Sequence, residues 1–484
     1  MIFTTPQFVV FFVLFFWIWI LAKGRARSWV LLAASYAFYA SWNAKFLVLI
    51  IGSTLVDFYV GRRLAQTHDQ GRRKRLLALS VGVNLGALAF FKYCNFFVES
   101  AIAGLEALGV QASLGTLEIV LPVGISFYTF QTMSYTIDIY RKKLDPTDRL
   151  LDFALYVAFF PQLVAGPIER ARNLLPQIAA LATRRPDYSG FGLIALGCFK
   201  KVVIADNLAA VVEMTYADPA NTYGPALWIG TYAFAVQIYC DFSGYSDIAV
   251  GLARLMGLDL IQNFEAPYAA RGPSELWRRW HISLSSWLRD YLYISLGGNR
   301  GTRIFVYRNL MLTMLLGGLW HGAAWNFVLW GAWHGLLLIA FRPQVLTAWG
   351  RRLDARPGTR VVSTFVRRLV FFHLVCIGWA FFRAESLADC GVLLERLICV
   401  WTWDVSAFTA GVAASGLGGW LALSGAMIAF IVGSQMLWPV GSNVVVARLW
   451  RAPEWVRFFV VATLLYACML GAPESPPPFI YFQF

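Results

Sequence analysis

Apolar windows of the length that a membrane span needs recur along the whole chain. A helix of about 17–25 mostly apolar residues crosses the hydrocarbon core of a bilayer. Only 14% of the 484 residues are charged, against about 25% in a typical soluble domain. The sequence therefore predicts an all-α polytopic membrane protein with about ten to twelve spans, several of them too short or too interrupted to be simple helices. The windows lie near Phe8–Ala22, Trp29–Trp42, Phe46–Val60, Leu76–Tyr93, Ile119–Ile139, Phe153–Val164, Phe191–Val212, Ala226–Leu255, Asn309–Ala340, Leu369–Phe382, Leu417–Leu437 and Phe458–Leu470.

Lysine and arginine gather in alternate connections between these windows. The net charge is +14. Basic residues follow the first window and the third, whereas the second-to-third connection holds only Lys45 and the loop Ile102–Glu118 holds none. Because lysine and arginine remain on the cytoplasmic side, we expect an extracytoplasmic N-terminus. Loop bias accounts for most of the positive charge, so we expect no nucleic-acid partner.

No metal-ligand or redox motif is present in the sequence. The seven cysteines lie singly, without a Cys-x-x-Cys pair. The histidines of the apolar segments do not have the i, i+4 spacing of a helical zinc site. We therefore expect neither a metal ion nor a bound cofactor.

The segment 257–308 interrupts the apolar pattern and is rich in arginine, so we expect it to be cytoplasmic or interfacial. Within it, Ser274 can cap a helix, and apolar side chains then recur at i, i+3, i+4 spacing. One face would hold Trp277, Trp280, His281, Leu284, Leu288 and Tyr291, and the other Arg278, Arg279, Ser286 and Arg289. This pattern predicts an amphipathic helix at the cytoplasmic interface, with His281 facing inward.

The arginines of this helix, Arg278, Arg279 and Arg289, allow two interpretations. They can anchor the helix to lipid headgroups. Alternatively, they form a basic, aromatic-lined mouth that receives an anionic nucleotide-type donor such as an acyl-coenzyme A. The sequence contains no P-loop, which argues against nucleotide hydrolysis.

The apolar segment 309–341 contains two histidines, His321 and His334. An ionisable side chain at membrane depth is costly and indicates a functional site. On one continuous helix the two would be separated by about 20 Å. Both flanks are basic, which favours a re-entrant pair of short helices turning near Trp320–Asn326; one long tilted helix is the alternative. In the re-entrant arrangement His321 can act as a general base in a cavity, and otherwise it is a core histidine satisfied by a neighbour such as Asn326.

Two further polar clusters lie in apolar surroundings. The stretch Gln237–Asp247 contains Asp241, Ser243 and Asp247. On a helix the two carboxylates project about 120° apart, so they are no acid dyad, and we expect them to bond to arginine or tyrosine on facing helices. The segment Phe160–Arg170 is interrupted by proline and glycine, which is typical of lumen-lining backbone and equally of a kinked helix end.

Taken together, these motifs resemble the membrane-bound O-acyltransferase family, in particular its bacterial branch typified by alginate O-acetyltransferase and D-alanine transfer proteins. The resemblance covers nearly the whole chain. It implies a ring of tilted transmembrane helices around a central funnel, with interfacial and re-entrant helices and an acyl donor that enters from the cytoplasm. The segments that carry it are Phe160–Arg170, Asp241–Asp247, Glu275–Arg300, Trp320–His334 and the terminal Pro478–Phe484.

The resemblance also implies residue roles. The family histidine that matches His321 is the catalytic one, and the histidine that matches His281 lies near the same tunnel. A neutral His321 would take a proton from a hydroxyl as it attacks an acetyl thioester. His281, Asn326 or a tryptophan N–H could steady the oxyanion or orient the base. The residues expected to line the tunnel or orient groups are Asn326, His334, Trp320, Trp325, Asp241 and Ser243.

The function implied is the movement of acetyl from cytoplasmic acetyl-coenzyme A across the bacterial inner membrane, for O-acetylation of an exported polysaccharide such as alginate. In alginate-type systems a separate exported acetyltransferase of the SGNH serine-hydrolase type receives the group. This chain has no such nucleophile, so we expect that partner. Two alternatives stay open: a D-alanyl or lipid-directed acyltransferase of the same family, and a polysaccharide or small-molecule transporter, although no self-similar halves are evident.

Overall fold

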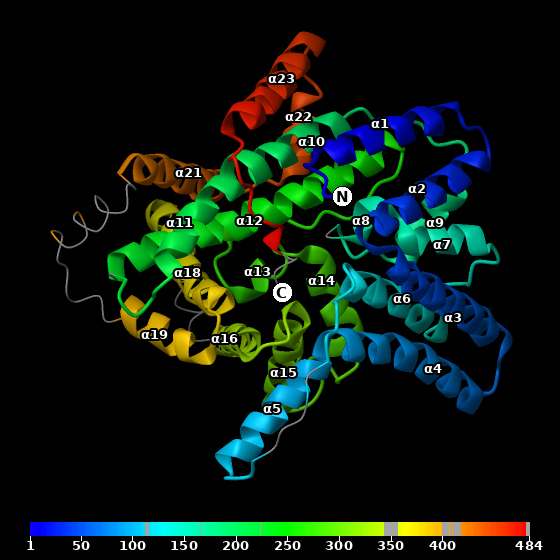
Figure 1. Ribbon diagram of the computed structural model, residues 1–484, viewed down its shortest axis with the longest axis horizontal. Coiled ribbons are helices and arrows are strands. Elements are labelled where there is room, and N and C mark those ends of the chain that lie inside the picture. Colours follow the sequence, from blue (N-terminus) through cyan, green and yellow to red (C-terminus); the bar gives the residue numbers. More distant parts are fainter. Residues whose placement is uncertain are drawn as a thin grey trace. The chain divides into compact units, whose positions relative to one another are not determined.

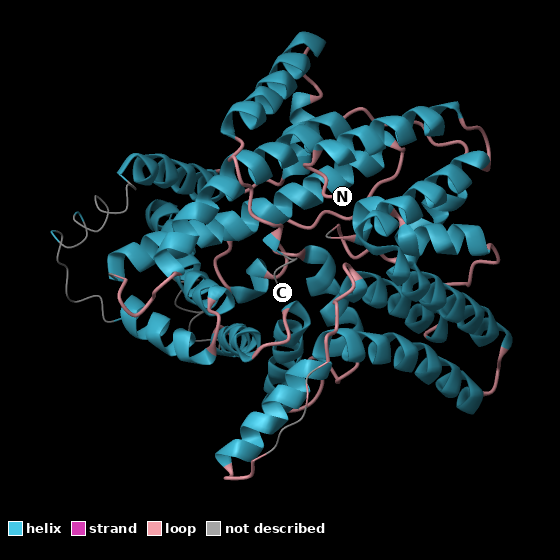
Figure 2. Cartoon of the chain, viewed as in Figure 1, coloured by secondary structure: helices cyan, strands magenta, loops and turns pink. Residues whose placement is uncertain are grey.

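Helices are the only regular secondary structure among the residues that the structure describes (Figure 1; coloured by type in Figure 2). The structure is a computed structural model that describes residues 1–111, 115, 117–164, 166–222, 224–342, 357–398, 406, 409 and 418–480. The prediction of an all-α chain is therefore confirmed. The last four residues of the terminal motif, Tyr481–Phe484, lie outside the described residues.

The chain divides into two compact units. The first comprises Met1–Phe191 and Ile248–Ile261, and the second comprises Gly192–Asp247 and Gln262–Phe484. The expectation of a single integral-membrane domain over residues 1–484 stays a prediction.

The first unit is built from helices α1 to α9. Its elements are α1 (Pro6–Leu21), α2 (Ala26–Asn43), η1 (Ala44–Phe46), α3 (Leu47–Gln66), α4 (Gln70–Leu88), the π-helix η2 (Ala89–Tyr93), α5 (Cys94–Ala107), α6 (Ile125–Tyr140), α7 (Leu150–Ala158), α8 (Phe160–Leu163) and α9 (Ala171–Ala179). α10 (Gly190–Cys198) and α12 (Gly224–Leu255) contribute residues to both units.

Helices α3, α4 and α6 pack on one another around a buried polar centre in the first unit (Figure 1). Asp57 of α3 accepts hydrogen bonds from Ser80 and Asn84 of α4. Thr132 of α6 donates to Asn84 at 3.1 Å. Because a buried polar group is costly without partners, these bonds hold the three helices in one register.

The second unit contains the segments that the sequence marks for function. Its elements are the π-helix η3 (Phe199–Ala205), α11 (Asp206–Tyr216), most of α12, η4 (Pro267–Ala269), α13 (Pro273–Leu276), α14 (Ile282–Trp287), the π-helix η5 (Leu288–Tyr293), α15 (Arg303–His321), α16 (Trp325–Ala340), α18 (Pro357–Arg383), α19 (Leu387–Ile398), α21 (Gly418–Leu437), α22 (Ser442–Leu449) and α23 (Glu454–Gly471).

Several of the described helices are long and apolar enough to cross a membrane. Four qualify singly: Ala26–Gln66, Gln70–Ala107, Arg360–Arg383 and Glu454–Gly471. A fifth qualifies if Ala422–Leu437 and Ser442–Leu449, which meet at 84°, form one broken span. The polytopic prediction is confirmed, but the number is below the about ten to twelve windows counted in the sequence. Many windows fold as short or broken helices: Phe191–Val212, for example, is divided among α10, η3 and α11.

The predicted amphipathic helix of residues 274–291 is wrong as one continuous element. The chain forms the short helices α13 and α14 with a break at His281, and then the π-helix η5. Helix α13 begins at Pro273 and its N-cap residue is Gly272, so Ser274 is not the cap.

The predicted division of faces holds in part. Five members of the predicted inner face are buried, and Trp277 is half-buried; the buried ones are Trp280, His281, Leu284, Leu288 and Tyr291. On the predicted outer face, Arg278 and Arg289 are exposed, whereas Arg279 and Ser286 are half-buried.

The segment 309–341 turns back on itself as a helical hairpin. Helix α15 ends at His321, and α16 begins at Trp325. A Cβ atom on Gly331 of α16 would overlap the carbonyl oxygen of Met314. Gly335, one turn further along α16, faces Met311, one turn earlier in α15. The two helices are therefore antiparallel and in close contact, and the alternative of one long helix is wrong.

Candidate functional site

The turn of the α15–α16 hairpin places His321 among aromatic rings. His321 is the last residue of α15 and is only 6% exposed. Its ring centroid lies 5.1 Å from that of Trp320, 5.0 Å from that of Trp330 and 5.4 Å from that of Phe382. Asn326 donates its side-chain amide to the carbonyl oxygen of Ala384 at 2.7 Å, which fixes the start of α16 to the end of α18. His321 is thus held by packing at a point where one helix ends and the next begins.

His281 lies beside His321, although forty residues separate them in the sequence. The two imidazole centroids are 6.4 Å apart, and Trp320 contacts both rings, at 5.9 Å from His281 and 5.1 Å from His321. The other side of His281 packs edge-to-face on Phe242 of α12 at 4.7 Å. The structure therefore brings together the two histidines that the sequence singled out as catalytic.

The backbone of His281 adopts a left-handed conformation, with φ 43° and ψ 54°. Such a conformation costs a non-glycine residue roughly 1–3 kcal/mol and persists only where its surroundings enforce it. Asn263 supplies that support: its carbonyl accepts from the Ile282 amide at 2.9 Å, and its Oδ1 accepts from the Ser283 hydroxyl at 2.7 Å. The break in the predicted helix thus turns the imidazole toward His321.

The His281 side chain is completely buried. Among the described helices, those that are long and apolar enough to cross a membrane do not include His281. Burial lowers the pKa of His281, so its imidazole is neutral. A neutral imidazole has one donor and one acceptor nitrogen and can orient a second group or steady developing charge.

His334 contacts the same Trp330 ring as His321. The Trp330 ring is 5.0 Å from His321 and 4.8 Å from His334, and Trp277 contacts His334 at 5.2 Å. A Cβ atom on Gly378 would be 2.9 Å from His334 Nε2, so the glycine makes room for this imidazole. We call His281, His321 and His334 with Trp320 and Trp330 the histidine cluster.

The remaining predicted tunnel residues lie in different surroundings. Trp320 is buried in the histidine cluster, whereas Trp325 is 50% exposed at the start of α16. Ser243 is buried on α12, next in sequence to Phe242. Among the described residues, no group of three or more histidine, cysteine, aspartate or glutamate side chains is placed to hold a metal ion.

Asp241 and Asp247 of α12 form ion pairs with lysines, not with the arginine or tyrosine partners that the sequence led us to expect. Lys201 Nζ lies 2.7 Å from Asp241 Oδ1 and 2.7 Å from Asp206 Oδ1. Lys200 Nζ lies 2.8 Å from Asp247 Oδ2. We call these five residues the lysine–aspartate cluster.

Two local features bring this cluster together. The lysines are consecutive in the π-helix η3, a rare helix type that often occurs at functional sites. Helix α12 closely approaches the end of α10 and the start of η3 at Gly244, where a Cβ atom would be 2.7 Å from the Gly197 carbonyl oxygen and 3.2 Å from Lys200 Cβ. Lys200 and Lys201 were not among the residues predicted from the sequence, although two adjacent lysines inside an apolar window are a signal of a buried polar site.

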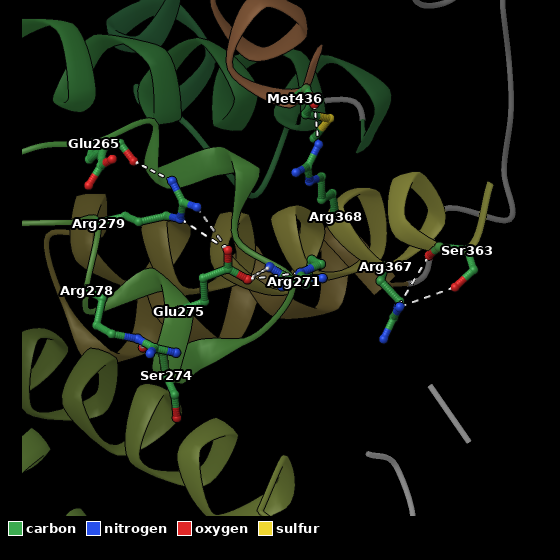
Figure 3. A network of polar contacts seen from close by, with 10 residues as sticks. All are labelled: Glu265, Arg271, Ser274, Glu275, Arg278, Arg279, Ser363, Arg367, Arg368 and Met436. Atoms are coloured by element: carbon green, nitrogen blue, oxygen red, sulfur yellow. Dashed lines mark hydrogen bonds and ion pairs between the residues drawn. The ribbon is translucent and has the colours of Figure 1, made fainter. Parts of the chain in front are cut away.

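The arginines assigned to donor binding differ in their contacts. Figure 3 shows Glu275 between Arg271 and Arg279. Arg279 also donates to the Glu265 carbonyl at 3.0 Å, and Arg289 pairs with Asp290 at 2.8 Å. Burial of the Glu275 carboxyl opposes ionisation, but hydrogen bonds from Arg271 and the charges of both arginines outweigh it and lower the pKa of Glu275.

Arg278 has a different environment from these paired arginines. Its side chain is exposed, and its Nε donates to the backbone carbonyl of Ser274 at 3.1 Å (Figure 3). Of the three arginines in the donor-binding prediction, Arg279 and Arg289 form ion pairs within the protein, whereas the contact that the structure gives Arg278 is to a neutral carbonyl.

Comparison with known proteins places this arrangement in one family. A model of the MBOAT, membrane-bound O-acyltransferase family matches residues 146–381, a range that includes His281, His321 and His334. The chain is 44% identical over 409 residues to the probable alginate O-acetylase AlgI of Pseudomonas aeruginosa, covering 84% of this chain and 76% of that protein. It is 34% identical over 433 residues to the peptidoglycan O-acetyltransferase of Helicobacter pylori, covering 82% and 80%. It is 28% identical over 279 residues to the teichoic acid D-alanyltransferase of Bacillus subtilis, covering 54% and 69%. With this identity over most of its length, the chain belongs to the membrane-bound O-acyltransferase family and is an O-acyltransferase.

Proposed function

We propose that this protein moves acetyl groups from cytoplasmic acetyl-coenzyme A across the bacterial inner membrane, for O-acetylation of an exported polysaccharide. The observation that carries the proposal is the buried pair of His321, at the end of α15, and His281, at the start of α14, whose rings are 6.4 Å apart. Together with the names of the alginate and peptidoglycan relatives, which both specify O-acetylation, this pair supports a base and an orienting group at one reaction centre.

In the proposed reaction, His321 acts as the general base. Its imidazole takes the proton from a hydroxyl group as that oxygen adds to the acetyl carbonyl carbon. The carbon–oxygen bond forms, the carbon–sulfur bond of the thioester breaks, and the proton passes from His321 to the departing thiolate. His281 or the indole N–H of Trp320 steadies the negative charge that develops on the carbonyl oxygen.

We assign the recognition of the anionic donor first to Arg278. Arg279 and Arg289 already form ion pairs with Glu275 and Asp290. The exposed Arg278 guanidinium can reach a phosphate without breaking such a pair, and arginine–phosphate contacts are strong and directional. The basic loops of the sequence support a cytoplasmic donor side and an extracytoplasmic N-terminus.

The acceptor on the far side is proposed to be a separate exported acetyltransferase of the SGNH type, which passes the group to the polysaccharide. A second candidate function is D-alanyl transfer, which is favoured by the similarity to the teichoic acid D-alanyltransferase over 54% of this chain. The two candidates share the histidine pair and differ in the acyl group and its carrier.

The test is the ester content of exported polymers in a strain from which the gene has been deleted. We expect the deletion to lower the acetyl-ester content of an exported polysaccharide, and the wild-type gene to restore it. D-alanyl ester in place of acetyl would move the assignment to the second candidate. No change in any polymer ester would refute the proposal.

A further inference from the structure

The segment of residues 478–480 lies against the α12 residues that support His281. Phe479 and Ile480 are both buried. The backbone amide of Ile480 donates to Asp241 Oδ2 at 2.8 Å, and the Phe479 ring packs on Tyr245 at 4.7 Å. A segment more than 230 positions away in sequence is therefore fastened to α12 by a charge-assisted hydrogen bond and by ring packing.

Asp241 connects this segment to the lysine–aspartate cluster. Its Oδ1 pairs with Lys201, while its Oδ2 accepts from Ile480. Lys201 also pairs with Asp206, so one ammonium group serves two carboxylates. Because both oxygens of Asp241 are engaged, the ion pair fixes the orientation of the carboxylate that holds the segment.

Phe242 connects the same segment to the histidine cluster. Its ring contacts Phe479 at 6.5 Å and His281 at 4.7 Å, in both cases edge-to-face. Phe242 is completely buried and also packs on Phe264 at 5.0 Å. A cavity left by the Phe479 ring would therefore open beside the residue on which His281 rests.

We propose that Phe479 and Asp241 are positioning residues of the acyl transfer site: the segment 478–480, anchored through Asp241, holds Phe242 and thereby His281 at its distance from His321. This inference rests on the proposed role of the histidine pair. Neither Phe479 nor Asp241 touches the reacting atoms; both act through Phe242.

Helix α12 provides a matched control. Asp247 pairs with Lys200 at 2.8 Å on the same π-helix, as Asp241 pairs with Lys201. Lys200 also donates to Ser442 at 2.8 Å, so this second pair is tied to α22 rather than to the segment 478–480. Asp241→Asn and Asp247→Asn thus each remove one carboxylate charge that is paired with a buried lysine, but only the first weakens the anchor of the segment.

The experiment measures two quantities in purified protein. The first is the rate at which diethyl pyrocarbonate modifies His281, read by mass spectrometry with His373 as the internal reference. The second is kcat and KM for the acetyl-coenzyme A donor. We expect Phe479→Ala and Asp241→Asn to raise the His281 modification rate about five- to thirtyfold, corresponding to one or two kcal/mol of local opening. We also expect kcat to fall about 10- to 100-fold while KM changes little, because the chemistry is misaligned but the donor site is intact.

Phe479→Leu, which keeps an apolar side chain in the same space, should recover most of both quantities. If Phe479→Ala does not fold, Asp241→Asn carries the test, with Asp247→Asn as its control. Unchanged His281 reactivity in Phe479→Ala would overturn the inference, as would equal effects of Asp241→Asn and Asp247→Asn. Because the modification rate needs no substrate, it decides this inference even if the proposed acyl group or acceptor proves wrong.

Discussion

The histidine cluster and the lysine–aspartate cluster both contain buried ionisable side chains in the second unit, but the groups that surround these side chains differ. The imidazoles contact aromatic rings with centroids 4.7–5.9 Å away. The lysines instead form direct ion pairs at 2.7–2.8 Å. An imidazole can give or accept a proton in a reaction, whereas a carboxylate locked to an ammonium cannot do so without losing its partner. The comparison separates a region suited to chemistry from a region suited to holding helices together.

The largest expected effect on stability comes from breaking the lysine–aspartate cluster. Lys201→Ala leaves Asp206 and Asp241 buried without their cation. Removal of one partner of a buried ion pair typically costs about 3–5 kcal/mol in the free energy of unfolding. Thermal unfolding of the purified protein would measure it, with the exposed Lys45→Ala as control. Equal stability of the two variants would remove the distinction between the clusters.

A smaller loss is expected where the hairpin that presents His321 is forced apart. A Cβ atom at Gly331 would overlap the Met314 carbonyl, so Gly331→Ala must separate α15 from α16. Overpacking of this kind lowers the free energy of unfolding by about 1–3 kcal/mol. We also expect the rate of acyl transfer to fall, because the turn that carries His321 is displaced. The control is Gly433→Ala on α21, where no atom lies within 4 Å of the added Cβ. In Gly433→Ala the free energy of unfolding should rise by up to about 1 kcal/mol, because alanine has the higher helix propensity. A similar rise in Gly331→Ala would show that the close contact between α15 and α16 is not required.

The smallest effect is expected at the partly exposed arginine network around Glu275. Glu275→Gln removes its ion pairs with Arg271 and Arg279 and should cost less than about 1 kcal/mol. Because the pKa of Glu275 is lowered in the folded protein, its stabilising contribution is complete above the ordinary glutamate value of about 4.3 and is lost as the pH falls through the folded pKa. The free energies of unfolding of wild type and Glu275→Gln, measured at a series of pH values, should therefore become equal in acid. A difference that grows in acid would contradict this assignment.

The sequence was sufficient to predict features that depend on composition and short-range pattern. The all-α chain, the return of the segment 309–341 and most of the predicted buried face follow from hydrophobicity, flanking charge and helical spacing. These properties are local, so they can be inferred without knowledge of which helices are neighbours.

Features that depend on distant partners could not be predicted in this way. The break at His281 is stabilised by Asn263, through hydrogen bonds that no helical periodicity encodes. The lysine partners of Asp241 and Asp247 lie 40 and 47 residues earlier, in a π-helix that ordinary helical spacing does not anticipate. The contact of Trp330 with both His321 and His334 likewise follows from the packing of the hairpin.

The most direct test of the central claim, that His321 is the catalytic base, compares His321→Ala with His373→Ala. His373 lies on α18, where its Nε2 is 2.9 Å from the Tyr232 hydroxyl and its Nδ1 is 2.7 Å from the Leu369 carbonyl oxygen, so both nitrogens have partners within the protein. The measurement is the release of coenzyme A from acetyl-coenzyme A by membranes that contain equal amounts of each variant. We expect His321→Ala to lose about 100- to 10,000-fold in rate, and His373→Ala to stay near the wild-type rate. Wild-type activity in a folded His321→Ala protein would contradict the account.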